Sequence, residues 1–514
     1  MEDKTLAKHA GKTAFGTVCS RILGYIRDML VANLFGVGMF ADAFYAAFRI
    51  PNLFRRMFGE GSFSAAFIPV FSQYLHTKDK EETQKFLNAI FTVLLLILVI
   101  ISILGMLFSS ALTKIVVWGF SDNPEKMQIT IELTRLMFPF IVFICLAAFF
   151  LAILNTLHSF FIPALAPASL SVSEVFYILS IAPLISPENQ IKGLAISVIL
   201  GGALHFFVQY PKLKSLGWHL NFRINLKHPG IKQVALLMIP SLVGLSVDQI
   251  NAFVDNICAS FLGNGPVSAL YYSNRLMQMP LAVFGLAFAA ASLPAMSKAY
   301  AKKDIATLKN SLNYSIRFTI FTLMPAAIGL MVIGLPIVKL LFEHGKFNVL
   351  GSIMTNKALF FYSLGLPAYA ISKIFANAFY SFQDTKTPVK VAIFSMIIHV
   401  VSCIVLMNPM GVSGLAFSTA ISSYFNSIVL TIFLRKRIGN IGTKLIIISF
   451  FKSFIASICT GIVAWHACKL STSLFLSVLI AIFSGVIVFI IVSYILKSEE
   501  LKSFKYIFLK NKTL

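Results

Sequence analysis

Long apolar segments separated by short polar connectors run along the whole chain. A membrane-spanning helix needs roughly 18 or more consecutive apolar residues, and the pattern predicts about 14 such spans. They lie near 10–35, 39–73, 86–112, 128–156, 160–185, 191–210, 232–263, 266–297, 310–335, 352–382, 388–408, 412–434, 445–466 and 472–496. A β-barrel would instead show short alternating segments. The predicted fold class is an all-α polytopic membrane protein.

The same motif occurs around an arginine in each half of the chain. It reads Ala43-Phe44-Tyr45-x-x-x-Arg49 in the first half and Ala269-Leu270-Tyr271-x-x-x-Arg275 in the second. A second repeated pair is Asn155-x-x-x-Ser159-Phe160 and Asn377-x-x-x-Ser381-Phe382. Repeated halves with a charge at matching places inside apolar helices are typical of transporters, whose binding site lies between the halves.

The repeat divides the chain into five predicted regions. They are an N-terminal lobe of six spans at 1–210, a cytoplasmic connector at 211–231, a C-terminal lobe of six spans at 232–434, a basic connector at 435–444, and a last region of two spans and a tail at 445–514. The lobes are predicted to be pseudo-symmetric around a central cavity. The last two spans are almost purely apolar, which fits either two packing helices or the wall of a lipid-facing groove.

Composition and charge agree with a membrane protein. Of the 514 residues 58% are hydrophobic and only 12% are charged, and the mean hydropathy is +0.84. The net charge of +23 is concentrated on the side of the membrane that holds both termini, with residues such as Lys212, Lys214, Arg223, Arg435, Lys436 and Arg437. The opposite side holds few basic residues: Lys114, Lys126, Lys192, Lys339, Lys346 and Lys469. This asymmetry predicts cytoplasmic termini and attraction to anionic lipids, and it excludes nucleic acid as the partner.

Several charged residues lie inside the first two spans. The first contains Arg21, Arg27 and Asp28, and a charge at mid-membrane costs at least about 2.5–3.5 kcal/mol, so these groups must face water or each other. The second contains a polar stripe on one helix face. Its members, spaced three or four residues apart, are Asp42, Tyr45, Arg49, Asn52 and Arg56.

Arginine is in excess over carboxylate in these spans and in the span of Arg275. The guanidinium group keeps its charge and suits phosphate oxygens, so a wet cavity lined by Arg21, Arg49 and Arg275 would suit a pyrophosphate. The alternative is that these arginines pair internally. For Arg55 and Arg56, snorkelling to an interface is an equally good explanation.

Other residue patterns argue against an enzyme. The chain has no nucleotide-phosphate loop and no H-E-x-x-H motif, and its six cysteines are scattered. Asp255, inside the seventh span, is a candidate ligand for a coupling cation or proton, or the neutralising partner of a nearby arginine.

Five stretches of the sequence carry a resemblance to a known family. They are Ser20-Arg21-Ile22-Leu23-Gly24-Tyr25-Ile26-Arg27-Asp28, Ala41-Asp42-Ala43-Phe44, Phe48-Arg49-Ile50-Pro51-Asn52-Leu53-Phe54-Arg55-Arg56, Gly59-Glu60-Gly61 followed by Ala65-Ala66-Phe67-Ile68-Pro69, and Tyr272-Ser273-Asn274-Arg275-Leu276-Met277-Gln278-Met279-Pro280-Leu281. Together they closely resemble the MurJ (MviN) family, the bacterial lipid II flippases of the multidrug/oligosaccharidyl-lipid/polysaccharide exporter superfamily. The resemblance extends along the whole chain.

The resemblance implies alternating access in the bacterial inner membrane, with lipid II (an undecaprenyl pyrophosphate carrying a disaccharide pentapeptide) as substrate. The family's basic cavity positions fall on Arg21, Arg27, Arg49, Arg55 and Arg275, and its acidic positions on Asp28 and Asp42. The last two helices would line a groove for the polyprenyl tail. No cofactor is implied, and cell-wall synthesis proteins are candidate partners.

The resemblance also concerns coupling. Some family members bind sodium, and the matching positions here are Asp255, Asn377 and Ser381, although Ser381 stands where an aspartate is expected. Na⁺, H⁺ and the membrane potential are therefore all candidates. Rival hypotheses are an exporter of another lipid-linked saccharide or a drug, a membrane enzyme acting on polyprenyl phosphates, and a scaffold for cell-wall enzymes.

Overall fold

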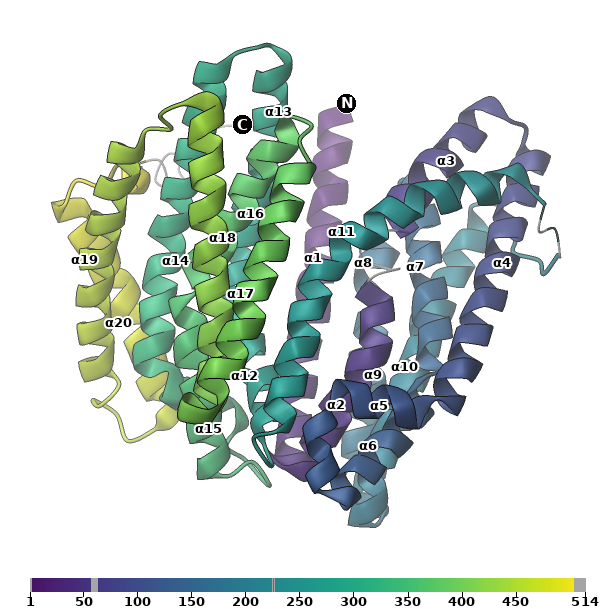
Figure 1. Ribbon diagram of the computed structural model, residues 1–514, viewed down its shortest axis with the longest axis horizontal. Helices are drawn as coiled ribbons and strands as arrows, with labels where there is room; N and C mark the ends of the chain where they lie inside the picture. The colour runs from purple at the N-terminus through teal and green to yellow at the C-terminus, as the bar shows by residue number, and fades with distance from the viewer. Residues whose placement is uncertain (1, 57–62, 224, 226, 503–514) are drawn as a thin grey trace. The chain divides into compact units, whose positions relative to one another are not determined.

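The computed structural model describes residues 2–56, 63–223, 225 and 227–502 (Figure 1). The motif Gly59-Glu60-Gly61 lies outside the described residues. Within them the chain is helical with no strand, which confirms the predicted all-α class. It forms two compact units, Met1–Val267 and Ser268–Leu514.

The first unit contains the helices α1 to α11. Their bounds are α1 Glu2–Phe35, α2 Met39–Phe54, α3 Phe63–Thr77, α4 Lys80–Leu107, α5 Ser109–Val116, α6 Pro124–Met137, α7 Phe140–Thr156, α8 Phe161–Leu165, α9 Ala168–Phe176, α10 Pro187–Ser215 and α11 Pro229–Ser260. Aromatic packing joins several of them: Phe67 of α3 stacks on Phe86 of α4 and meets Phe149 of α7 edge-on.

The second unit contains the remaining helices. Their bounds are α12 Pro266–Pro280, which begins at the boundary, α13 Leu286–Ala301, α14 Ile305–Phe342, α15 Val349–Leu364, α16 Leu366–Ser381, α17 Lys386–Met410, α18 Val412–Ile438, α19 Thr443–Ala467 and α20 Leu474–Ile495. The core of this unit joins α13, α14, α16 and α18. Helices α19 and α20 pack on α14 through residues such as Ala456 and Phe489.

The repeat in the sequence is visible as a proline at matching places inside two helices. In the second unit α12 is followed by the π-helical turn η5 (Leu281–Gly285) and by α13, which contains Pro294. In the first unit the helix after α2 is α3, which contains Pro69 at the matching place. Both Pro residues remove a backbone donor inside a helix, which bends helices locally.

Two further pairs of features follow the repeat. The pairs α6–α7 and α15–α16 are each bent by 41° at a short break. Asp79 caps α4 by accepting from the Glu82 N–H at 2.8 Å, and Asp304 caps α14 by accepting from the Thr307 N–H at 2.9 Å. Since an N-cap carboxylate satisfies a free helical N–H, the two halves begin corresponding helices in the same way.

Eight helices of the described residues are long and apolar enough to cross a membrane, or up to ten if each bent pair is one span. The chain is thus a multi-pass membrane protein, while the predicted number of fourteen spans is not confirmed. The difference lies partly in helices such as α2, which has only 16 residues and contains Asp42 and Arg49.

Packing and repeat divide the chain at different points. Helix α11 belongs to the first compact unit, where it contacts α3 and α4, whereas the repeat assigns it to the second lobe. The repeat groups helices by similarity of sequence, whereas packing groups them by their contacts in this structure. The two groupings differ at α11, so the predicted lobe boundaries stay a prediction.

Candidate functional site

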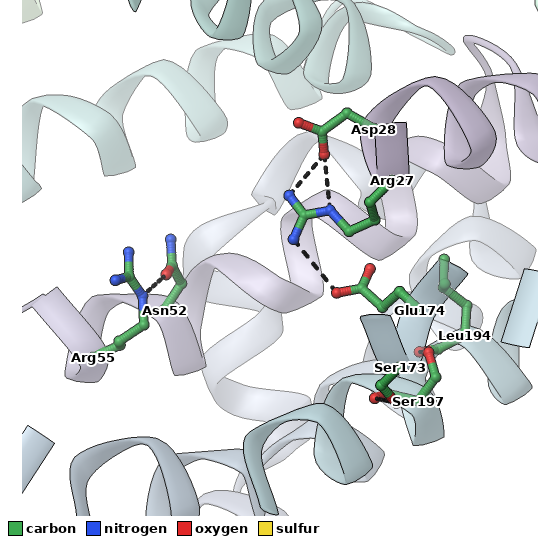
Figure 2. A network of polar contacts seen from close by, with 8 residues as sticks. All are labelled: Arg27, Asp28, Asn52, Arg55, Ser173, Glu174, Leu194 and Ser197. Carbon is green, nitrogen blue, oxygen red and sulfur yellow. Dashed lines mark hydrogen bonds and ion pairs between the residues drawn. The ribbon is translucent and has the colours of Figure 1, made fainter. Parts of the chain in front are cut away.

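Arg27 of α1 lies between two carboxylates in the first unit (Figure 2). Its Nε and one terminal nitrogen donate to the same oxygen of Asp28, at 3.0 and 2.7 Å. The other terminal nitrogen lies 3.5 Å from Glu174 Oε1 on α9. The Arg27 side chain is 12% exposed, and those of Asp28 and Glu174 are 1% and 4% exposed. The guanidinium is therefore largely buried in the helix bundle, and a small part of the side chain stays exposed.

Helix α9 and the turn that follows it are both joined to α10 by hydrogen bonds. The Ser173 hydroxyl donates to the Ser197 carbonyl at 2.8 Å, as Figure 2 shows, and the Tyr177 hydroxyl donates to the Gln190 carbonyl at 2.7 Å. A π-helical turn, η3 (Tyr177–Ile181), directly follows α9. Turns of this kind are often found at functional sites. Glu174 is thus fixed by α10, while Arg27 reaches it from α1.

Two arginines of the second predicted span, Arg49 of the polar stripe and Arg55 at the end of α2, make separate contacts. Arg49 donates to the carbonyl of Ala252 on α11 at 2.6 Å. Arg55 donates through Nε to Asn52 Oδ1 at 2.7 Å (Figure 2). Pro51 lies inside α2 between them. Both arginines are half-buried, so they are neither enclosed in the core nor fully in solvent.

Asp42 lies in a closed environment. Its Oδ2 is 2.8 Å from Lys126 Nζ of α6 and accepts from the Gly265 N–H at 2.6 Å. Lys126 Nζ also donates to the Gly263 carbonyl at 2.9 Å and lies 3.9 Å from the Phe120 ring centre. Since both side chains are almost fully buried, this pair joins α2 and α6 to the loop before α12.

The remaining candidate arginines are placed differently. Arg21 is exposed on α1, six residues before Arg27. Arg275 is half-buried on α12 of the second unit, at the position that repeats Arg49. The structure therefore places Arg27, Arg49 and Arg55 in one unit and Arg275 in the other.

The candidate sodium ligands are also divided between the units. Asp255 is half-buried on α11 of the first unit, and Asn377 and Ser381 lie one turn apart on α16 of the second. The Asn377 amide nitrogen donates to the Ala289 carbonyl at 2.7 Å, and the Ser381 hydroxyl donates to the Ala378 carbonyl at 2.7 Å. The Ser381 oxygen keeps its lone pairs when the hydroxyl hydrogen is donated, and hard cations bind oxygen lone pairs. The side-chain oxygens of Asn377 and Ser381 are therefore of the type that binds a cation.

Comparison with known proteins now adds to this geometry. A family model described as "Lipid II flippase MurJ" matches residues 31–492. The chain belongs to this family. The MurJ relatives include a lipid II flippase of Burkholderia cenocepacia, 36% identical over 425 residues, which are 82% of each chain. They also include a probable lipid II flippase of Vibrio cholerae, 37% identical over 421 residues and 80% of each chain.

Solved structures agree with the MurJ assignment. A MurJ lipid II flippase in an inward closed conformation is 28% identical, covers 94% of this chain and 98% of its own, and has a TM-score of 0.80. An inward-facing multidrug transporter of the MATE family is 16% identical with a TM-score of 0.69, which shows a shared fold only. The family confirms the prediction of a transporter rather than an enzyme.

The sequence pattern alone gives little reason to select two residues of this site, Glu174 and Lys126. Glu174 is a single acid in an apolar span, and Lys126 indicated only topology. Their partners are 147 and 84 residues away in the chain, and helical periodicity relates only neighbours on one helix. An acid inside an apolar span with no basic residue three or four positions away is the signal that could have identified Glu174. Lys126 has Asp122 four positions before it, so the sequence carries no such signal for Lys126.

Proposed function

We propose that this chain moves lipid II from the cytoplasmic to the periplasmic leaflet of the bacterial inner membrane by alternating access, with both termini in the cytoplasm. The observation that carries the proposal is the match to one flippase family along most of the chain, together with arginines on α1, α2 and α12. No covalent bond is made or broken in such a reaction.

The proposed mechanism uses arginine to replace water around the pyrophosphate. Arg21, Arg27, Arg49, Arg55 and Arg275 line a cationic cavity, and charge-assisted hydrogen bonds from guanidinium groups offset the cost of dehydrating the anion. Asp28 orients Arg27 through the paired contact described above, and Asp42 keeps α2 in place. The disaccharide pentapeptide follows the pyrophosphate through the cavity.

The polyprenyl tail stays in lipid beside α19 and α20. Both helices carry many exposed apolar side chains, among them Phe451, Ile455, Ile462, Phe483 and Ile487. An apolar surface of this kind is at no disadvantage in contact with an acyl or prenyl chain, because neither side loses hydration there. Such a surface suits a prenyl tail as well as it suits bilayer lipid.

Replacement of Arg275 by alanine in cells depleted of their own lipid II flippase tests the proposal. We expect lysis despite normal membrane abundance, with lipid II retained in the cytoplasmic leaflet. Arg435→Ala, which changes an exposed arginine at the end of α18, is the matched control and should sustain growth. Normal growth with Arg275→Ala would contradict a substrate role for Arg275. Failure of the unchanged chain to sustain growth would contradict the proposed substrate.

A further inference from the structure

Glu174 is a buried acid with no evident role in binding a pyrophosphate, because a carboxylate repels an anion. It lies on α9, is 3% exposed, and faces Arg27 at 3.5 Å. That guanidinium already donates twice to Asp28. A third anion, the substrate, must therefore approach Arg27 against the repulsion of two carboxylates, which is strong where little water is present.

The two carboxylates hold Arg27 unequally. Asp28 is the next residue on α1 and moves with Arg27, and its contacts are 3.0 and 2.7 Å. Glu174 belongs to α9, which is tied to α10 by Ser173 and Tyr177, and its contact is longer. A movement of α1 relative to α9 would separate Glu174 from Arg27 and leave the Arg27–Asp28 pair unchanged.

From this difference we propose that Glu174 is a positioning residue which competes with the substrate anion for Arg27. It neutralises Arg27 when the site is empty, yields to the pyrophosphate when the substrate binds, and recaptures Arg27 when the substrate leaves. Glu174 therefore weakens binding and speeds release. The inference rests on the proposed function, because it assigns the competing anion to the pyrophosphate of that substrate.

The test compares Glu174→Gln with the unchanged full chain in lipid nanodiscs and proteoliposomes. Glutamine keeps the size and the hydrogen-bonding oxygen but removes the charge. We expect binding of farnesyl pyrophosphate and of lipid II to become about three- to tenfold tighter, since one nearby repulsion is lost. We also expect a lower maximal rate of transfer of fluorescent lipid II, because release becomes slower.

Three further variants make the result specific. Glu174→Asp keeps the charge and should bind nearly as the unchanged chain does. Glu132→Gln removes a carboxylate that pairs with Lys192 at 3.0 Å and should change neither quantity. In an Arg27→Ala background, Glu174→Gln should give no tightening, because the competition acts through Arg27.

The outcomes separate the inference from the proposed function. Unchanged or weaker binding in Glu174→Gln overturns the inference, as does tightening that persists in full without Arg27, even if the unchanged chain transfers lipid II normally. If the unchanged chain does not transfer lipid II, the proposed function fails. The effect of Glu174→Gln on farnesyl pyrophosphate then still decides whether Glu174 competes for Arg27.

Discussion

Lys126 and Asp42 form an ion pair whose side chains are only 2% and 0% exposed. Dehydrating two charges is expensive, and the pair is tolerable only because further contacts satisfy it. Here these are the Gly265 N–H, the Gly263 carbonyl and the face of the Phe120 ring. Removing one partner leaves the other charge buried and uncompensated. The pair therefore adds little net stability, but the loss of one partner lowers the stability strongly.

Lys126→Met should therefore destabilise the first unit by about 3–5 kcal/mol. The readouts are the apparent unfolding temperature of the purified protein and its abundance in membranes. Lys114→Met, at an exposed lysine of α5, is the matched control and should have little effect. Combining Lys126→Met with Asp42→Asn removes both charges and should restore most of the loss. Equal stability of the Lys126 and Lys114 variants would contradict the structural role of the pair.

At single residues the sequence identified charged positions better than it identified partners. Arg27, Asp42 and Arg49 were predicted because a charge inside an apolar span must be satisfied. That Asp42 is satisfied by a buried lysine, and Arg49 by the Ala252 carbonyl, depends on which helices pack together. Packing of distant helices leaves no periodic signal in either segment.

Among the elements, the segment that follows α20 is fastened to α14. Arg317 of α14 donates through Nε to Glu500 at 2.6 Å and through a terminal nitrogen to Glu499 at 2.7 Å. Glu500 is buried and Glu499 is exposed. Lys452 of α19 adds a bond to the Lys497 carbonyl at 3.1 Å. These contacts join α14 and α19 to the segment that follows α20.

The contact between Arg317 and Glu500 should make the stability of the folded protein depend on pH. Burial raises the pKa of the Glu500 carboxyl, but a backbone hydrogen bond and the Arg317 guanidinium outweigh it, so the pKa in the folded protein lies below the ordinary value. A lowered pKa contributes stability that is complete above the ordinary pKa of about 4.3 and is lost as the pH falls through the folded value.

Glu500→Gln should therefore lower the unfolding temperature by about 2–4 °C at pH 7. The difference from the unchanged chain should shrink as the pH falls below about 4. Thermal unfolding of both proteins across this range measures it. Glu499→Gln should have a smaller effect at pH 7, because an exposed pair is screened by water. A difference that stays constant down to low pH would rule out titration of Glu500 as its source.

At the level of elements the repeat was the most informative part of the sequence. It predicted two related halves, and the structure shows corresponding helices in the two pairs that are bent by 41°, α6–α7 and α15–α16. The predicted number of fourteen spans is not confirmed, because helices that carry the polar residues are short or charged, as α2 is. The division at α11 depends on packing, which a repeat does not record.

For the whole molecule, the driving force follows from the charge of the cargo. The membrane potential contributes about 2.3 kcal/mol per charge per 100 mV, and an anion that leaves a negative interior moves in the favourable direction. An outward flippase for a pyrophosphate lipid therefore needs no second ion in order to move its cargo energetically downhill.

We expect transfer in proteoliposomes to depend on the potential and not on sodium. Ser381 provides a neutral hydroxyl where the family pattern has a carboxylate, so Asp255 is the one charged group left in the candidate ligand set to balance a monovalent cation. A set with one carboxylate fewer binds the cation more weakly. Replacing Na⁺ by choline should leave the rate unchanged, whereas collapsing the potential should lower it several-fold. Ser381→Asp should introduce dependence on Na⁺, while Ser381→Asn, which adds similar bulk without charge, should not. A marked loss of rate in choline with the unchanged chain would contradict this expectation. It would show that sodium coupling needs no aspartate at position 381.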